Sequence, residues 1–184
     1  ALPVARRAGA ATVAASLVLV SQAGAFWPPT HIAVALLKDG RAQVALAERF
    51  GATTVAPEPR GELIQTIADW SGGVLQPADG LPMAFPGGID VVYDTVGAAE
   101  TLEVGARVLR ARGALVKLGM HGPARWEDTP VYFKEINFTG SNAFGFETVD
   151  GVRKHGIELY LDLVESARID LTGMLTHTFR LEQW

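Results

Sequence analysis

Apolar residues gather in short continuous runs along this chain instead of alternating with polar residues. Four such runs are four to seven residues long, at Leu17–Val20, His31–Leu37, Ile89–Asp94 and Ala114–Leu118. A continuous apolar run is typical of a strand that is buried on both faces of a parallel sheet. The pattern therefore predicts a sheet whose strands are covered on both sides.

Segments with helical periodicity follow several of these runs. Residues 42–50 and 61–73 each carry apolar side chains on one helical face and are closed by glycine. A third helix is expected at 98–112, with Arg110 and Arg112 in its last turn, near the negative end of the helix dipole. These segments predict that helices pack against the sheet.

The remaining segments complete an alternating order of strands and helices. The other expected elements are a strand at 53–55, a proline-rich surface loop at 74–88, a short helix end and strand at 134–141, a long amphipathic helix from Val152 through Leu163, a strand at 175–179 and the start of a helix at 180–184. This alternation predicts an α/β protein with a doubly wound, mostly parallel sheet.

Small, polar or glycine residues follow four of the expected strands. They are Lys38-Asp39, Asp94–Gly97, Gly119–His121 and Gly140–Asn142. Ligands of doubly wound sheets bind beyond the carboxyl ends of the strands, where a small residue lets the backbone approach them. We therefore expect the binding edge of the sheet at these four places.

The connection between the first two runs is too short for this architecture. Only ten residues, 21–30, lie between them, and these include Pro28, Pro29 and a single glycine, Gly24. A parallel crossover needs about a dozen residues or more. A dinucleotide-binding turn also needs several glycines, followed by a helix whose free N–H groups meet the pyrophosphate. The first βαβ unit is therefore expected to be damaged or incomplete, with 1–30 an atypical segment and 31–184 the domain proper.

Charge and composition exclude several classes of function. The formal net charge is −4 and no basic stripe is present, so we expect no nucleic-acid partner. The chain has no cysteine, which excludes disulfides and thiolate metal sites and fits a reducing compartment. The four histidines, His31, His121, His155 and His177, are too scattered to form a recognisable zinc site. We therefore expect no metal ligands and no catalytic residue, and a lone Asp94 or His121 is weak evidence for acid–base chemistry.

The N-terminal region leaves two alternatives open beside a buried strand. Residues 8–37 carry no charged side chain and follow Arg6-Arg7, so they resemble a secretion signal with cleavage after Ala25. A membrane span is the weaker alternative, because Ser21, Gln22 and Pro28 interrupt the apolar run. We expect a cytoplasmic protein without a membrane partner.

Four motifs, taken in order, resemble the cofactor domain of zinc-type alcohol dehydrogenases in the medium-chain dehydrogenase/reductase superfamily. They are RAQVALAERFGATTV at 41–55, GIDVVYDTVGAAETLEVGARVLRARGALVKLGM at 88–120, KEINFTGSNAFG at 134–145 and LYLDLVESARIDLTGMLTHTFRLEQW at 159–184. The resemblance extends over residues 36–184. It implies a Rossmann-type fold that binds NAD(P) in an enzyme passing a hydride between an alcohol and the cofactor, with zinc polarising the alcohol oxygen in complete relatives.

The resemblance also implies a set of cofactor-binding residues. Thr95, Val96 and Gly97, together with Leu118, Gly119 and Met120, resemble the family's loops that flank the nicotinamide ring. Lys38 stands where the family often has the acidic residue that binds the ribose, and with Arg41 it would suit the additional phosphate of NADP. The alternatives are ordinary turns for the two loops and a solvated strand end for Lys38.

Two departures from the family limit what this chain is expected to do. The family's G-x-G-x-x-G turn is missing from 21–30, and the GroES-like catalytic domain, with its cysteine zinc ligand, has no counterpart in the sequence. We therefore expect weak NAD(P) binding that favours NADP slightly, no activity for the isolated chain, and zinc in complete relatives only. A non-enzymatic α/β module that binds a nucleotide or another protein is the alternative, and the resemblance also allows a homo-oligomer.

Overall fold

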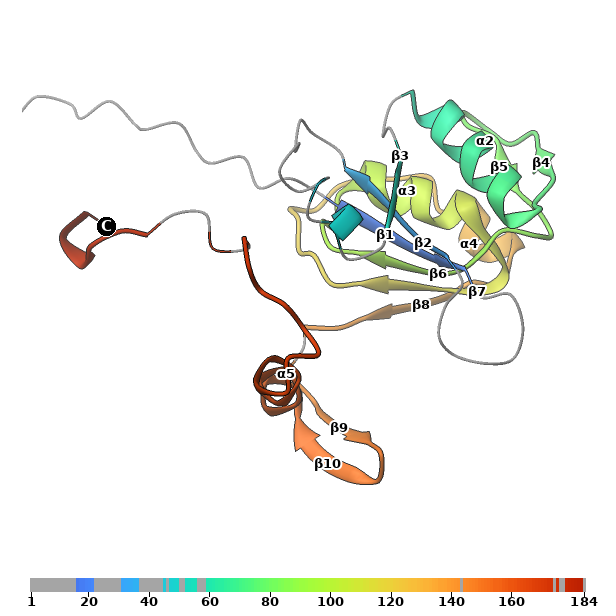
Figure 1. The fold of residues 1–184 in the computed structure, drawn as a ribbon. Coiled ribbons are helices and arrows are strands. Elements are labelled where there is room, and N and C mark those ends of the chain that lie inside the picture. Colours follow the sequence, from blue (N-terminus) through green and yellow to red (C-terminus); the bar gives the residue numbers. More distant parts are fainter. Residues whose placement is uncertain are drawn as a thin grey trace, which may run out of the picture.

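The computed structural model describes residues 16–21, 31–36, 45, 47–49, 52–55, 59–142, 144–173, 175 and 178–183. Its largest sheet has six strands in the order β3-β2-β1-β6-β7-β8 (Figure 1). The strands are β1 (Ser16–Ser21), β2 (His31–Leu36), β3 (Thr53–Val55), β6 (Ile89–Asp94), β7 (Leu109–Lys117) and β8 (Asn137–Gly140). This is the strand order of the doubly wound dinucleotide-binding sheet, so the expected α/β fold class is confirmed.

One strand of this sheet runs in the opposite direction to the others. β2 pairs with β3, β6 with β7 and β7 with β8 in parallel, whereas β1 is antiparallel to both β2 and β6. Residues 22–30 join β1 to β2, and so short a segment can connect antiparallel neighbours but cannot hold a parallel crossover. The first βαβ unit is therefore incomplete, as the length of this connection predicted.

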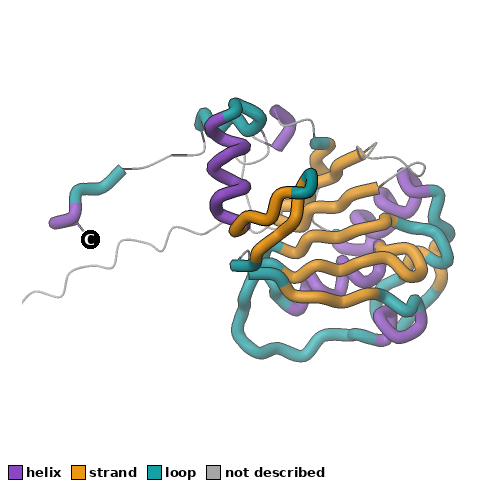
Figure 2. The backbone as a smooth tube through the Cα atoms, turned by 90° about the horizontal axis from the view of Figure 1, so that it is seen from below, coloured by secondary structure: helices purple, strands orange, loops and turns teal. Residues whose placement is uncertain are grey.

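Three helices cover one face of the sheet: α2 (Arg60–Ser71), α3 (Ala99–Val108) and α4 (Thr129–Phe133). Figure 2 shows the sheet from its other face, with these helices behind it. The core between the two layers consists of Leu63, Ile64, Ile67, Ile89, Val92, Leu102, Val104, Ala106, Val108, Leu109, Leu115 and Ile136. The predicted helix at 61–73 and the strands at 53–55 and 89–94 are confirmed. Of the helix expected at 42–50, residues 45 and 47–49 are helical and the others lie outside the described residues.

The helix predicted at 98–112 is wrong in its C-terminal part. α3 ends at Val108, and β7 begins at the next residue, so Arg110 and Arg112 lie in a strand. The Nε atom of Arg110 lies 2.6 Å from Asp90 Oδ1 on β6, which holds this arginine in the sheet. The basic residue in the last turn of α3 is Arg107, and Lys134 donates hydrogen bonds to the carbonyl oxygens of Ala106, Arg107 and Leu109 at this helix end.

The segment predicted as a surface loop at 74–88 contains a small two-stranded sheet of β4 (Leu75–Gln76) and β5 (Met83–Ala84). The fully buried side chain of Arg107 fastens this segment to α3, because it donates to the carbonyl oxygens of Leu81 and Asp79. The excursion is therefore part of the packed structure.

The C-terminal region differs most from its prediction. A hairpin of β9 (Phe146–Val149) and β10 (Val152–His155) precedes α5 (Gly156–Glu165), so the helix expected from Val152 begins four residues later. Asp150 and Gly151 form the turn of this hairpin with φ values of 52° and 79°. The hairpin and α5 stand beside β8, apart from the helical layer (Figure 1).

The last two predicted elements have different outcomes. Leu175, Thr178 and Phe179 lie in no strand, so the strand at 175–179 is wrong for these residues, while Thr176 and His177 lie outside the described residues. Leu181–Gln183 forms a 3-10 turn (η1), the short helical start expected there. Among the described residues, no helix combines the length and the apolar character needed to cross a membrane.

Candidate functional site

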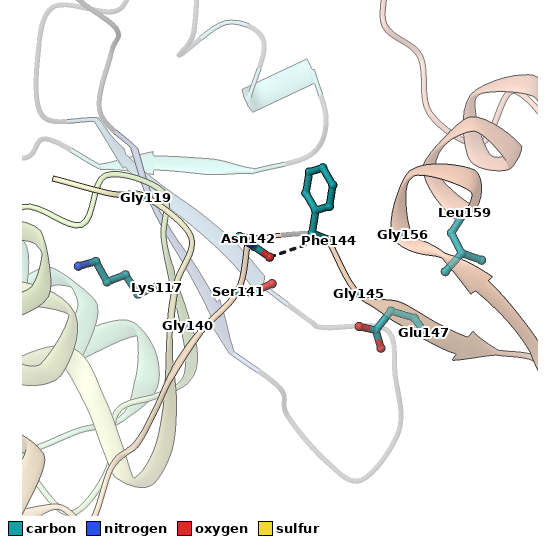
Figure 3. A pocket seen from close by; sticks show the side chains of 10 residues that line it. All are labelled: Lys117, Gly119, Gly140, Ser141, Asn142, Phe144, Gly145, Glu147, Gly156 and Leu159. Carbon is teal, nitrogen blue, oxygen red and sulfur yellow. Dashed lines mark hydrogen bonds between the residues drawn. The ribbon is translucent and has the colours of Figure 1, made fainter.

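A cleft of about 730 Å³ opens at the carboxyl ends of β7 and β8. Figure 3 shows it between the end of the sheet and the unit formed by β9 and α5. Its lining residues are Lys117, Gly119, Gly140, Ser141, Asn142, Phe144, Gly145, Glu147, Gly156 and Leu159. The cleft lies at the edge where the ligands of a doubly wound sheet bind.

The two loops predicted to flank the nicotinamide ring meet beside this cleft. Thr95–Gly97 follows β6 and Leu118–Met120 follows β7, and the two backbones touch at Gly97 and Gly119. A Cβ atom on Gly119 would lie 2.2 Å from the carbonyl carbon of Val96, and one on Gly97 would lie 2.3 Å from the carbonyl oxygen of Gly119. Both positions therefore require glycine because no side chain fits between the loops.

Asp94, the last residue of β6, organises the first of these loops. Its side chain is fully buried, and its Oδ1 accepts hydrogen bonds from the backbone N–H groups of Val96 and Gly97, both at 2.9 Å. Its Oδ2 lies 3.0 Å from the hydroxyl group of Thr101, which also lies 2.9 Å from the carbonyl oxygen of Ala98. With these three donors the buried carboxylate is satisfied, so its place in the structure does not indicate an acid–base role.

The backbone of Asp94 also holds the second loop. Its carbonyl oxygen accepts from the N–H groups of Leu118 at 2.8 Å and Gly119 at 3.0 Å. One residue therefore contacts both loops, through its carboxylate on one side and its carbonyl group on the other.

The antiparallel direction of β1 determines at which edge of the sheet the strand ends before and after residues 22–30 lie. Leu17 lies opposite Asp94 and Val20 opposite Val91, so the end of β1 at Ser21 points away from the cleft edge. Ser21 and His31 pair with each other at this far edge. The two strand ends that flank residues 22–30 therefore lie at the edge opposite the cleft.

Lys38 and Arg41 lie outside the described residues. The last residue of β2, Leu36, pairs with Ser16, next to the pair that Leu17 forms with Asp94. β2 thus ends at the same edge of the sheet as the two loops.

The cleft contains groups that can bind and orient a polar ligand. Ser141 can donate a hydrogen bond, and the carbonyl oxygen of the Asn142 side chain accepts from the N–H of Phe144 at 3.2 Å, whereas the side chain of Lys117 points away from these residues (Figure 3). Glu147 adds a carboxylate on the side of β9. Within the described part of the chain, no group of three or more His, Cys, Asp or Glu side chains is placed to hold a metal ion.

Sequence reasoning missed the far wall of the cleft. Phe144 lies just before β9, Glu147 on β9 and Leu159 on α5. His155 caps α5 by accepting from the N–H of Ile157 at 3.2 Å. The adjacent Asp150-Gly151 pair, a strong hairpin signal between two short runs, could have revealed this wall.

The profile of the family described as zinc-binding dehydrogenase matches residues 31–158. D-arabinitol dehydrogenase 1 from Uromyces fabae is 28% identical over 102 residues, which are 54% of this chain and 27% of the relative. The chain thus spans about a quarter of the length of this curated relative.

Solved structures show the same fold. The zinc dependent alcohol dehydrogenase 2 of Streptococcus pneumonia superposes with a TM-score of 0.58 at 21% identity, over 78% of this chain and 36% of its own. A protein described as a zinc-binding dehydrogenase from Sinorhizobium meliloti 1021, solved bound to NADP, superposes with a TM-score of 0.50 at 25% identity, over 77% of this chain and 36% of its own. Because the family profile matches residues 31–158, which are more than half of the chain, the chain belongs to the zinc-binding dehydrogenase family of the medium-chain dehydrogenase/reductase superfamily.

Proposed function

We propose that this chain is the cofactor portion of an NAD(P)-dependent, zinc-type alcohol dehydrogenase-like oxidoreductase, and that it binds the dinucleotide weakly. Three observations support this function: the family membership, the relative solved with NADP, and the cleft at the carboxyl edge of the sheet. The cleft next to the paired loops carries the proposal, because it lies where the fold binds ligands.

The residues at the cleft fit the nicotinamide half of a dinucleotide. Gly97 and Gly119 keep side chains out of the junction between the loops, and Ser141 offers a hydrogen-bond donor in the cleft. When bound, the cofactor would supply hydride transfer, and the residues of this chain would bind and orient it. We assign Thr95, Val96, Gly97, Leu118, Gly119 and Met120 to this half of the site, and Lys38 and Arg41 to the adenosine phosphate of NADP.

The pyrophosphate half of the site has lost its usual support. In an intact site, backbone N–H groups at the start of a helix make charge-assisted hydrogen bonds of roughly 1.5–3 kcal/mol each to the pyrophosphate. Here the connection after β1 attaches to the opposite edge of the sheet. Losing two or three such bonds costs on the order of 4 kcal/mol, or about a thousandfold in affinity, which moves a micromolar site to roughly millimolar.

Calorimetric titration with NAD and NADP tests this function. The chain should bind both at roughly millimolar affinity, with NADP no weaker than NAD. A variant in which a glycine-rich turn and a helix replace residues 22–30 should bind more tightly, because β1 can then run parallel to its neighbours. The control replaces the same segment with a flexible Gly/Ser linker of equal length and should not gain affinity. Equal micromolar affinity in all three chains would contradict the proposal.

A non-enzymatic module that acts through protein contacts is the second candidate, and one observation favours it. α5 has no buried residue, and Phe146, Val149 and Val152 of the preceding hairpin are exposed. Such a surface is also compatible with the homo-oligomer that the family resemblance allows. Sedimentation velocity over a range of concentrations tests it, since a chain that remains monomeric would speak against self-association.

A further inference from the structure

We propose that Asp94 is the positioning residue of the dinucleotide site, holding the two loops that flank the nicotinamide ring in one fixed arrangement. This inference rests on the proposed function and adds to it a residue that does not itself touch the cofactor. Asp94 is fully buried, so its influence on a ligand in the cleft must pass through the backbones that it binds.

The contacts of its carboxylate are specific to the first loop. Oδ1 receives two backbone N–H groups, from Val96 and Gly97, at the same distance of 2.9 Å. Ala98, the residue before α3, brings no side-chain hydrogen bond to the start of that helix. The turn between β6 and α3 therefore depends on the carboxylate of Asp94 and on its partner Thr101.

The first loop in turn fixes the second. Gly97 is in direct backbone contact with Gly119, and the space that a Cβ on Gly97 would fill is bounded by Gly119 and by the stem of Lys117. Lys117 and Gly119 both line the cleft. Movement of the first loop would thus be passed to the cleft wall, while the carbonyl group of Asp94 holds Leu118 and Gly119 from behind.

The cost of this arrangement points to a role beyond an ordinary turn. Burying a carboxylate is expensive unless hydrogen bonds satisfy it, whereas a surface turn needs only an exposed Asp or Asn. The chain places this buried carboxylate at the end of the central strand β6, at the edge where ligands bind. A fixed loop geometry is what such a site requires.

Amide NMR of the full chain, titrated with NADP, tests the role of Asp94. Asp94→Ala should weaken NADP binding by about tenfold and speed hydrogen exchange at Val96 and Gly97. Asp94→Asn keeps an oxygen that can accept both N–H groups and should restore affinity to within about threefold. If Asp94→Ala fails to fold, Thr101→Val offers a milder change. We expect Thr101→Val to weaken NADP binding as well.

Asp90→Ala is the matched control, because Asp90 lies on the same strand and pairs with Arg110 away from the loops. It should lower stability without changing NADP affinity, as measured on fully folded protein. Unchanged affinity in Asp94→Ala and Thr101→Val, or an equal loss in Asp90→Ala, would overturn the positioning role.

Failure of the proposed function gives a different result. If the wild-type chain shows no NADP-induced shifts at millimolar concentration, the dinucleotide function is wrong. Whether Asp94 holds the two loops is then decided by hydrogen exchange alone. Unchanged exchange at Val96 and Gly97 in Asp94→Ala would overturn the positioning role of Asp94 too.

Discussion

Lys134 fixes the junction between α3, β7 and the segment that follows α4. The residue is 1% exposed, and its Nζ atom donates to three carbonyl oxygens, of Ala106, Arg107 and Leu109, at 2.9, 2.8 and 2.6 Å. Lys134→Met keeps a stem of similar shape but leaves the three carbonyl groups without this donor. Because a buried acceptor that loses its donor costs roughly 1–3 kcal/mol, we expect a loss on the order of 3 kcal/mol in the free energy of unfolding, measured with urea. Lys154→Met, at an exposed pair with Asp162, is the control and should change the stability much less, because solvent screens this pair.

The same residue predicts a pH dependence of stability. Burial, together with the nearby charge of Arg107, lowers the pKa of Lys134 from 10.5 to about 7. Between these two values the unfolded chain holds a proton that the folded chain has released, so stability rises with pH from about 7 to 10.5 and is level below this window, where both states are protonated. Urea unfolding at several pH values should show this rise in the wild type and not in Lys134→Met. Parallel pH profiles for the two proteins would contradict the prediction.

At the scale of elements, the direction of β1 is the feature that separates this sheet from an ordinary, mostly parallel doubly wound sheet. Ser16 lies opposite Leu36, and Leu17 lies opposite Ala35, in antiparallel register. Directly opposed Cα atoms of such strands are about 4.5–5.5 Å apart, which suits a disulfide. Because the natural chain has no cysteine, the double variants Ser16→Cys/Leu36→Cys and Leu17→Cys/Ala35→Cys can be oxidised cleanly, and we expect a crosslink in at least one of them.

The control for this crosslink is Ser16→Cys/Ile32→Cys, a pair near the starts of the two strands that the antiparallel register keeps apart. In the antiparallel register Ile32 lies four residues from the partner of Ser16, or roughly 13 Å along the strand, which is too far for a disulfide. Mass spectrometry after oxidation distinguishes the two registers. A crosslink in the control alone would show that β1 runs parallel to β2.

The sequence correctly predicted the elements that are determined by residues within the element or directly beside it. α2 and β6 are periodic, apolar and bounded by glycine, so both were found from the sequence. The end of α3 was misplaced because the helical pattern continues to Arg112, whereas from Leu109 the chain pairs with β6 as strand β7. No local sequence pattern predicts the direction of β1. The length of 22–30 excluded a parallel crossover but did not by itself predict the antiparallel pairing. The two candidate loops were found because strand ends are recognisable, whereas the far cleft wall depends on a hairpin that folds back from β8.

For the molecule as a whole, the proposed cofactor domain is only one part of what an alcohol dehydrogenase needs. The described residues hold no cluster of metal-binding side chains, and the full sequence contains no cysteine. The chain also spans only 27% of D-arabinitol dehydrogenase 1 and 36% of the alcohol dehydrogenase from Streptococcus pneumonia. A cofactor domain can bind the dinucleotide, but zinc-assisted oxidation also needs a metal that polarises the alcohol oxygen.

We therefore expect the purified 184-residue chain to oxidise neither primary nor secondary alcohols with NAD or NADP, with or without added zinc. The absorbance of the reduced nicotinamide follows the reaction, and a complete zinc-dependent alcohol dehydrogenase in the same buffers is the positive control. Gly119→Val distinguishes weak activity of this chain from that of a contaminating enzyme, because a side chain there collides with the backbone of Thr95 and Val96 and should disrupt the cleft. Turnover that is present in the wild type and lost in Gly119→Val would contradict the prediction and place the chemistry in this chain.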